Sequence, residues 1–279
     1  MFIDSHAHLF FKDYQNDLDD VLQRARDAGV EYIVCPGTDL ETSRRSIELS
    51  EKYDLVYACV GFHPHDALKA SEKSLEEIEK LSHHPKVVAV GEIGLDYHYN
   101  FSPPGIQREV FSKQIDIARR RNLPVVIHSR EAEGDTLEIV EETVVADVDW
   151  RKSGLDESHG GFFPRGVFHC FAGNSATARK VINWGFFISI PGLITFPVKP
   201  GKNGTMIEVV QSIPIEHILL ETDSPYLTPH PYRGKRNEPS YIPIIAGKIS
   251  ELTGLSLETV GRESTLGAQA LFGIGKKLH

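Results

Sequence analysis

Residues 2–9 read FIDSHAHL, a short apolar run that leads directly into two histidines. The run Phe2–Asp4 predicts a buried strand, and His6 and His8 follow its carboxyl end. In an extended segment, side chains two residues apart face the same way, so both imidazoles can reach one point. A buried strand with ionisable side chains at its carboxyl end is a pattern that recurs along the chain.

Further apolar runs predict more strands. They are mostly near-continuous rather than alternating, which is typical of parallel strands that are buried on both faces. These predicted strands are Tyr32–Pro36, Val56–Gly61, Val87–Gly91, Leu123–Ile127, Gly166–His169, Phe186–Ile190 and His217–Leu220. Amphipathic, helix-like segments lie between them. Eight βα units in about 270 residues predict a closed (β/α)8 barrel, a TIM barrel, and a doubly wound open sheet is the alternative fold.

We expect all 279 residues to form a single domain. The segment 146–165 is polar and contains glycine, which predicts an extended loop after the fifth strand. The composition, 41% hydrophobic and 25% charged, excludes a disordered chain. The net charge of −9 argues against a basic protein that coats DNA, whereas an enzyme that meets nucleic acid at one local site is compatible with it.

The sequence also bears on the compartment. No apolar run approaches the roughly 18 residues of a membrane span, and residues 1–10 lack the basic and apolar parts of a signal peptide. The cysteines, Cys35, Cys59 and Cys170, have no paired spacing, which argues against a disulfide framework. We therefore expect a cytoplasmic protein with reduced cysteines and no membrane partner.

Ionisable side chains follow six of the eight predicted strands, always at the carboxyl end. In a barrel these ends converge on one face, where active sites lie. Buried charge is costly unless it is paired or bound to metal. Four histidines and two carboxylates would point into one mouth, namely His6, His8, Glu92, His128, His169 and Asp223. Imidazole and carboxylate are usual ligands of divalent metals, so the set predicts one or two metal ions.

With these residues in place, the chain resembles the TatD family of metal-dependent hydrolases, within the wider amidohydrolase-type barrels. The matching motifs are DSHAHL at 4–9, GFHPHDA at 61–67, GEIGLDYH at 91–98, LPVVIHSREA at 123–132, GVFHCFAG at 166–173, LLETDSPYLTP at 219–229 and RGKRNEP at 233–239. They occur in the family's order and span nearly the whole chain. The resemblance implies a (β/α)8 barrel with a binuclear metal centre, in which His6 and His8 bind the first metal and His128 and His169 bind the second.

Catalysis is expected to depend on two carboxylates, Glu92 and Asp223. The resemblance makes Glu92 the ligand that bridges two divalent ions, which would be Mg²⁺, Mn²⁺ or Zn²⁺. It makes Asp223 the aspartate that binds metal and handles the proton of the attacking water. A metal lowers the pKa of such a water from about 15.7 towards 7, which supplies hydroxide at neutral pH.

Other residues near the mouth are expected to hold the substrate. His63, Arg130 and Arg233 would bind phosphate, and Tyr226 would line the same mouth. Glu221 would lie behind the ligands and orient one of the histidines.

The expected function is that of a metal-dependent deoxyribonuclease, a 3′-to-5′ exonuclease that acts on the ends of single strands. An acidic body repels long duplexes, while a small positive mouth attracts one phosphate at a chain end. The same centre can instead hydrolyse another bond, such as a D-aminoacyl ester on tRNA or a small cyclic amide, because fold and metal do not set the substrate. A catalytically idle binding protein is the remaining alternative, against which the intact ligand set argues. The sequence predicts no oligomeric state.

Overall fold

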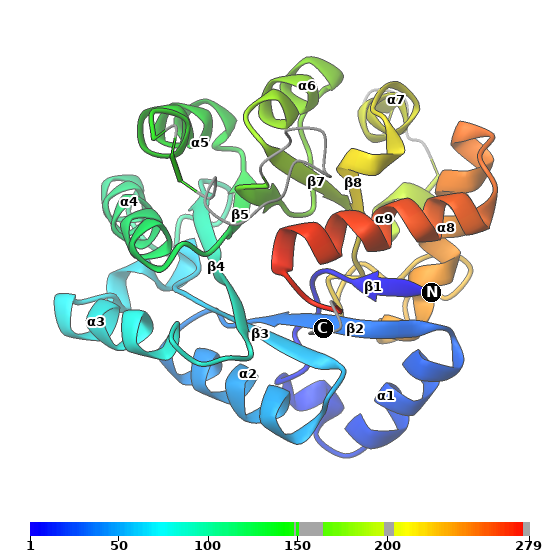
Figure 1. The fold of residues 1–279 in the computed structure, drawn as a ribbon, viewed down its shortest axis with the longest axis horizontal. Coiled ribbons are helices and arrows are strands. Elements are labelled where there is room, and N and C mark those ends of the chain that lie inside the picture. Colours follow the sequence, from blue (N-terminus) through cyan, green and yellow to red (C-terminus); the bar gives the residue numbers. More distant parts are fainter. Residues whose placement is uncertain (148, 151–163, 198–203, 276–279) are drawn as a thin grey trace.

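The computed structural model describes residues 1–147, 149–150, 164–197 and 204–275 of the chain. Within these residues, eight parallel strands form one sheet in the order β1 to β8 (Figure 1). Their bounds are β1 Phe2–Asp4, β2 Val30–Pro36, β3 Val56–Val60, β4 Val87–Asp96, β5 Val125–Arg130, β6 Gly166–Phe168, β7 Phe186–Ile190 and β8 Ile218–Leu220. Each predicted strand has a counterpart. The largest difference is at β4, which continues to Asp96 instead of ending at Gly91.

Hydrogen bonds that join the residues just after β1 to the end of β8 and the residues after it close the ring. Ser5 N donates to Leu220 O over 3.0 Å, and Asp223 N donates to His6 O over 2.9 Å. A doubly wound open sheet would leave these two edges apart, so the barrel prediction is confirmed and the alternative fold is wrong. The same bonds set two of the predicted ligands, His6 and Asp223, side by side.

Helices surround the strands, as expected for βα units (Figure 1). In the described part of the chain they are α1 Leu18–Asp27, α2 Leu40–Lys52, α3 Glu72–Leu81, α4 Pro104–Arg121, α5 Glu133–Val140, α6 Ser175–Asn183, α7 Gly204–Ser212, α8 Ile242–Thr253 and α9 Leu257–Phe272. Capping side chains accept hydrogen bonds from the first turns of several helices. The Asp39 carboxylate accepts from Thr42 N, and the Asn174 side chain accepts from Ala176 N and Thr177 N.

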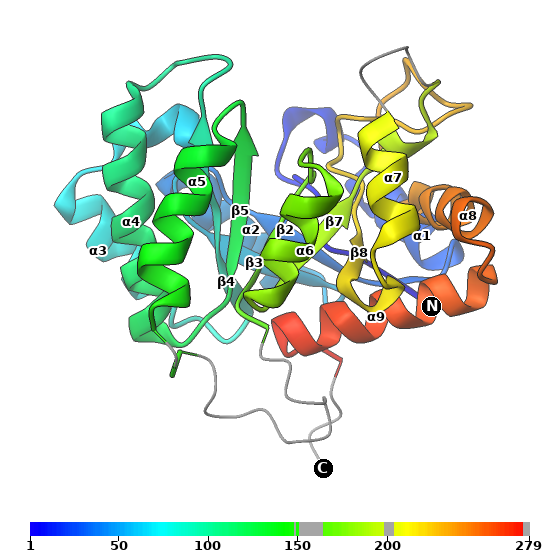
Figure 2. The same ribbon diagram turned by 90° about the horizontal axis from the view of Figure 1, so that it is seen from above.

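The interior of the barrel has its own apolar cluster. Val126 and Val167 lie two residues before His128 and His169, so all four side chains point inward. The two valines belong to a buried cluster that also contains Leu271 at the end of α9. Figure 2 shows α9 lying beneath the strands, and it therefore closes the amino-terminal end of the barrel. The carboxyl end is left for polar side chains.

Two further expectations concern the loop at 146–165 and the number of domains. Most of the predicted loop at 146–165 lies outside the described residues; α5 runs into a π-helical turn, Glu141–Val145, just before it. A single domain over all residues stays a prediction. No described helix has both the length and the apolar character that a membrane span requires.

Candidate metal centre

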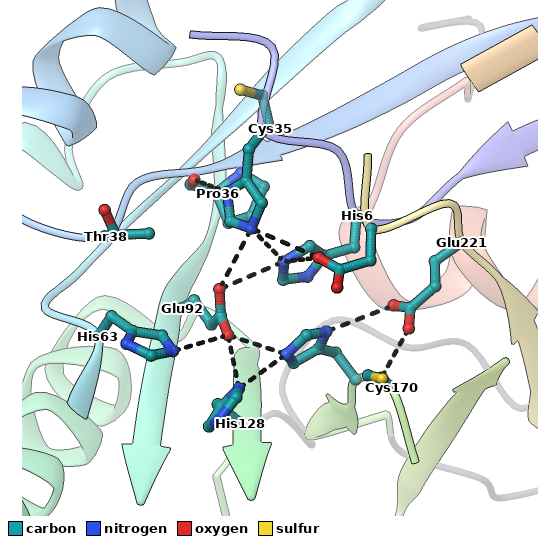
Figure 3. Close-up of polar contacts among 12 residues, drawn as sticks. His6, Cys35, Pro36, Thr38, His63, Glu92, His128, Cys170 and Glu221 are labelled. Atoms are coloured by element: carbon teal, nitrogen blue, oxygen red, sulfur yellow. Dashed lines mark hydrogen bonds and ion pairs between the residues drawn. The ribbon is translucent and has the colours of Figure 1, made fainter. Parts of the chain in front are cut away.

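The predicted ligands converge at the carboxyl end of the barrel. Figure 3 shows His6, Glu92 and His128 pointing toward a common centre. His6 is completely buried, Glu92 is 3% exposed and His169 is 6% exposed. Burying this many ionisable groups costs free energy unless they are paired or hold an ion, so the cluster points to a bound cation.

One oxygen of Glu92 faces the first group of ligands, which we call the first pocket. His6 Nε2 and His8 Nε2 lie 3.2 Å apart, and they lie 3.3 and 3.6 Å from Glu92 Oε2. Asp223 Oδ1 lies 3.8 Å from His6 Nε2 and 3.5 Å from His8 Nε2. Ligand atoms about 2.1 Å from one ion lie roughly 3–4 Å from one another, so the atoms of His6, His8 and Glu92 fit a single cation, with Asp223 close to both histidines.

The other oxygen of Glu92 faces the second pocket. Glu92 Oε1 lies 2.9 Å from His128 Nδ1 and 2.8 Å from His169 Nε2, and the two nitrogens are 3.2 Å apart. His63 Nε2 approaches the same oxygen to 3.4 Å. One carboxylate therefore stands between two groups of imidazoles, as a bridging ligand must. His63, predicted to hold phosphate, lies at the second pocket beside the predicted ligands.

Asp223 reaches the first pocket through an unusual backbone conformation. Its φ of 53° is in the left-handed region, which non-glycine residues enter at a cost. The hydrogen bond from Asp223 N to His6 O holds this conformation. Cys170, directly after His169, has a φ of 45°, and its N–H donates to Glu221 Oε1 over 2.6 Å. Strained residues held in place at strand ends are typical of functional sites.

Outer contacts orient the imidazoles. His8 Nδ1 donates to Pro36 O over 3.3 Å, which leaves the Nε2 lone pair for a metal. His128 Nε2 lies 3.2 Å from Asp96 Oδ2, so Nδ1 faces the second pocket. His169 Nδ1 lies 3.6 Å from Glu221 Oε2 (Figure 3). Glu221 thus lies behind His169, and its role in orienting that histidine stays a prediction.

Electrostatics in the second pocket favour a cation. Burial alone would raise the pKa of Glu92, but the surrounding histidines, led by His169, hold that pKa well below its usual value. Burial opposes the charged form of His169, yet Glu92 raises its pKa well above the usual value. Burial lowers the pKa of His63 to about 4, so this imidazole is neutral at pH 7. A metal ion that enters must displace the proton on His169.

The structure adds two residues that the sequence did not single out. Asp96, at the end of β4, accepts from His65 Nε2 over 2.9 Å as well as contacting His128. Asp4 is fully buried and accepts from both N–H and Oγ1 of Thr222, at 2.9 and 2.6 Å. Burial, the largest effect, raises the pKa of Asp4 to about 8 against those hydrogen bonds. The signal for Asp96 was its motif, GEIGLDYH, whose strand was predicted to end too early.

The predicted substrate residues occupy different places. Arg130 ends β5, and its guanidinium carbon lies 4.7 Å from the centre of the Tyr99 ring. Tyr226 is 54% exposed and contacts Phe11, which packs against His8 of the first pocket.

Arg233 lies over Phe196 instead, 4.2 Å from the ring centre. Beside the second pocket there is a cavity of about 500 Å³, lined by Arg130, Glu133, His169 and Phe171 among others. A cavity of this size accommodates a small ligand or one nucleotide of a larger one.

Comparison with known proteins agrees with this geometry. The family model "TatD related DNase" matches residues 3–273. The chain is 43% identical over 274 residues to the uncharacterized metal-dependent hydrolase YabD of Bacillus subtilis, covering 98% of this chain and 100% of that protein. It is 32% identical over 275 residues to a protein of Klebsiella pneumoniae named 3′-5′ ssDNA/RNA exonuclease TatD, covering 97% of each chain.

Solved structures give the same result. The crystal structure of YjjV, a TatD homologue from Escherichia coli, superposes with a TM-score of 0.86 at 29% identity and covers 98% of both chains. The phosphotriesterase homology protein from Escherichia coli, at 13% identity and a TM-score of 0.65, shares the fold. The barrel, the buried His/Glu clusters and the match across nearly the whole chain lead to one conclusion: this chain belongs to the TatD family of metal-dependent hydrolases.

Proposed function

We propose that the chain is a nuclease that binds two divalent ions and hydrolyses phosphodiester bonds, working from the 3′ end of single-stranded DNA. The observation that carries the proposal is Glu92, whose two oxygens face two separate histidine pockets. Paired metal sites that share a ligand are typical of enzymes that cleave phosphate esters. The exonuclease name of the Klebsiella pneumoniae relative supports the same reaction. A cytoplasmic location is part of this proposal.

Divalent ions bound in the two pockets would activate a water and polarise the phosphoryl oxygens. Asp223 would orient that water and take its proton. Burial opposes the charged form of Asp223, but the neighbouring imidazoles, led by His8, keep its pKa below the usual value. The carboxylate is therefore ionised at neutral pH and can act as a base. The water oxygen would bond to phosphorus as the bond from phosphorus to the leaving sugar oxygen breaks, and that oxygen would take back the proton that Asp223 accepted.

Substrate would be held around the second pocket. Arg130 offers planar N–H donors that suit a phosphate, and it borders the cavity beside His169. His63 would orient a phosphoryl oxygen, Tyr226 would line the far side, and Arg233 would meet the strand further out. The overall charge of −9 favours attack at a chain end over tracking along a duplex.

The test is hydrolysis of a 5′-labelled single-stranded DNA oligonucleotide with and without Mg²⁺ or Mn²⁺, beside the Asp223→Ala variant. We expect a metal-dependent ladder that shortens from the 3′ end and is absent in the variant. Closed circular single strands should resist. Circles cut as fast as linear strands would contradict the exonuclease. If protein that demonstrably holds metal cleaves no strand, the favoured substrate becomes a D-aminoacyl ester or a cyclic amide.

A further inference from the structure

Two large aromatic rings lie exposed beside each other between β4 and α4. Tyr99 is 49% exposed and Phe101 is 62% exposed. Exposing such rings to water is unfavourable, and adjacent exposed rings are typical of binding surfaces. Neither ring is needed for the metal pockets described above.

These rings have a defined orientation. The planes of Tyr99 and Phe101 are within 1° of parallel, with centroids 5.5 Å apart. The ring of His65 meets both edge-to-face, at 5.4 and 4.9 Å. The guanidinium of Arg130 lies over Tyr99. Guanidinium and aromatic rings therefore form one ledge, which we call the aromatic ledge (Tyr99, Phe101 and Arg130).

Hydrogen bonds hold the backbone of the segment that carries the aromatic ledge. Ser102 is fully buried, and its hydroxyl donates to His65 O over 2.9 Å and accepts from Leu68 N over 3.1 Å. Gln107 Nε2 donates to Ser102 O over 2.7 Å and to Asp96 O over 2.9 Å. These hydrogen bonds fix the backbone on both sides of the rings. Little conformational entropy is therefore lost when a ligand binds to them.

The aromatic ledge is continuous with the metal centre. His65, against which both rings pack, shares the Asp96 carboxylate with His128 of the second pocket. The His63 and His65 rings are 4.3 Å apart. A nucleic-acid strand whose phosphate lies at the second pocket would therefore place its adjacent nucleotide over these rings.

We propose that the aromatic ledge binds a nucleobase of the strand, next to the phosphate that is cleaved. Phe101 offers its open ring surface for stacking, and Arg130 keeps its N–H edge free for the adjacent phosphate while its face covers Tyr99. Stacking accepts every base, because each has a π face, but it requires that base to be unpaired. The ledge would thus select single strands without selecting sequence. This inference rests on the proposed nuclease function and adds the substrate subsite.

The first test compares KM and kcat of the metal-loaded enzyme on a single-stranded oligonucleotide. Phe101→Ala should raise KM by about 5- to 100-fold, with a smaller change in kcat. Phe101→Trp should retain the wild-type KM, because indole also stacks. The control is Leu266→Ala on α9, where a side chain that is 52% exposed lies outside the mouth; it should leave KM unchanged.

The second test places one abasic nucleotide at successive positions from the 3′ end. Wild type should lose affinity at one position, and Phe101→Ala should show no loss there, because the ring and the base it stacks on act as a pair. Equal sensitivity of both proteins at every position would overturn the aromatic ledge alone. If wild type degrades no strand while holding metal, the nuclease proposal and the ledge fall together.

Discussion

At the scale of single residues, Asp96 shows how a side chain outside the ligand set controls the centre. One oxygen of its carboxylate lies within hydrogen-bonding distance of both His65 Nε2 and His128 Nε2. The contact fixes which nitrogen of His128 faces Glu92. Asp96 is therefore a positioning residue, and it acts on the metal through His128.

Replacing Asp96 by Asn should lower metal affinity and turnover together, by about 10- to 100-fold, because the neutral amide holds His128 less firmly. Metal titration by calorimetry and oligonucleotide turnover measure the two effects. Far-UV circular dichroism should be unchanged. Wild-type metal affinity in a folded Asp96→Asn protein would remove the positioning role.

Asp223→Asn should reduce turnover by at least about 10²-fold in metal-loaded protein, since an amide can bind metal but cannot take a proton from water. The matched control is Asp116→Asn on the outer face of α4, whose carboxylate is 53% exposed. Steady-state turnover of both variants decides the question. An Asp223→Asn variant with full metal-dependent activity would disprove the proton-transfer role.

The sequence predicted the candidate metal ligands better than the residues that hold those ligands in place. His6, His128 and His169 each follow or end an apolar run, so the strand-end pattern found them. Asp4 also ends such a run, but the sequence does not show what it contacts. Its partner, Thr222, lies 218 residues away, and only the closed ring brings the two together.

At the scale of elements, β4 is the strand that the sequence predicted least well. The predicted strand ends at Gly91, yet the observed strand continues through Gly91 and Gly94 to Asp96. Their missing side chains allow β5 to approach closely: a Cβ on Gly94 would lie 2.0 Å from His128 O, and one on Gly91 would lie 2.6 Å from Val126 Cβ. Packing between strands therefore overrides local propensity.

Gly94→Ala should destabilise the protein by roughly 3 kcal/mol or more, because its φ of 138° disfavours a side chain and the added carbon meets backbone. Gly105→Ala, where no atom lies within 4 Å of an added Cβ in α4, should be neutral or slightly stabilising. Urea unfolding midpoints of the two variants measure the difference. Equal midpoints would show that β4 and β5 can separate at no cost.

A bidentate ion pair joins α1 to the segment that follows β8. Arg24 of α1 donates through Nε and Nη2 to Glu238, at 2.8 and 2.7 Å, and the Glu238 side chain is only 9% exposed. Burial opposes the charge, but Arg24 holds the pKa of Glu238 below its usual value. The pair thus stabilises the fold when Glu238 is ionised, which is above the pKa of an unfolded glutamate.

Glu238→Gln should therefore lower the free energy of unfolding at pH 7 by about 1–3 kcal/mol. The deficit should shrink as pH falls below about 4.3, and vanish once the folded Glu238 is itself protonated. Urea titrations at pH 7 and at acid pH, with EDTA present, test this, and exposed Glu76→Gln serves as control. A deficit that does not depend on pH would exclude the ion pair as its source.

At the scale of the whole molecule, the apolar interior and the metal centre occupy opposite ends of one barrel. The interior cluster, which includes Val126 and Leu271, is built without any of the predicted ligands. We therefore expect the barrel to fold without metal, in contrast to small zinc domains that fold only when loaded.

Chelation should abolish turnover while the barrel stays folded. Divalent metal should raise the melting temperature by several degrees, since it binds the folded state alone. Calorimetry and far-UV circular dichroism, with EDTA and then with added Mn²⁺ or Zn²⁺, measure both effects. Loss of the helical signal on chelation would show that the centre holds the fold together.

The overall architecture could be predicted because continuous apolar runs are typical of parallel strands buried on both faces. The contacts that close the ring could not be predicted, since they join residues such as Ser5 and Leu220, which are 215 residues apart in the sequence. The predicted loop at 146–165 lies largely outside the described residues, so it stays a prediction.

The join between β1 and β8 also governs the order in which the centre is completed during synthesis. A ribosome delivers His6 and His8 first and Asp223 only when most of the chain has been made. Until β8 emerges, Ser5 lacks the carbonyl of Leu220 and the first pocket lacks its aspartate. Under the proposed function, a nascent chain is thus an inactive nuclease, beside the messenger RNA that encodes it, until β8 and Asp223 have been made.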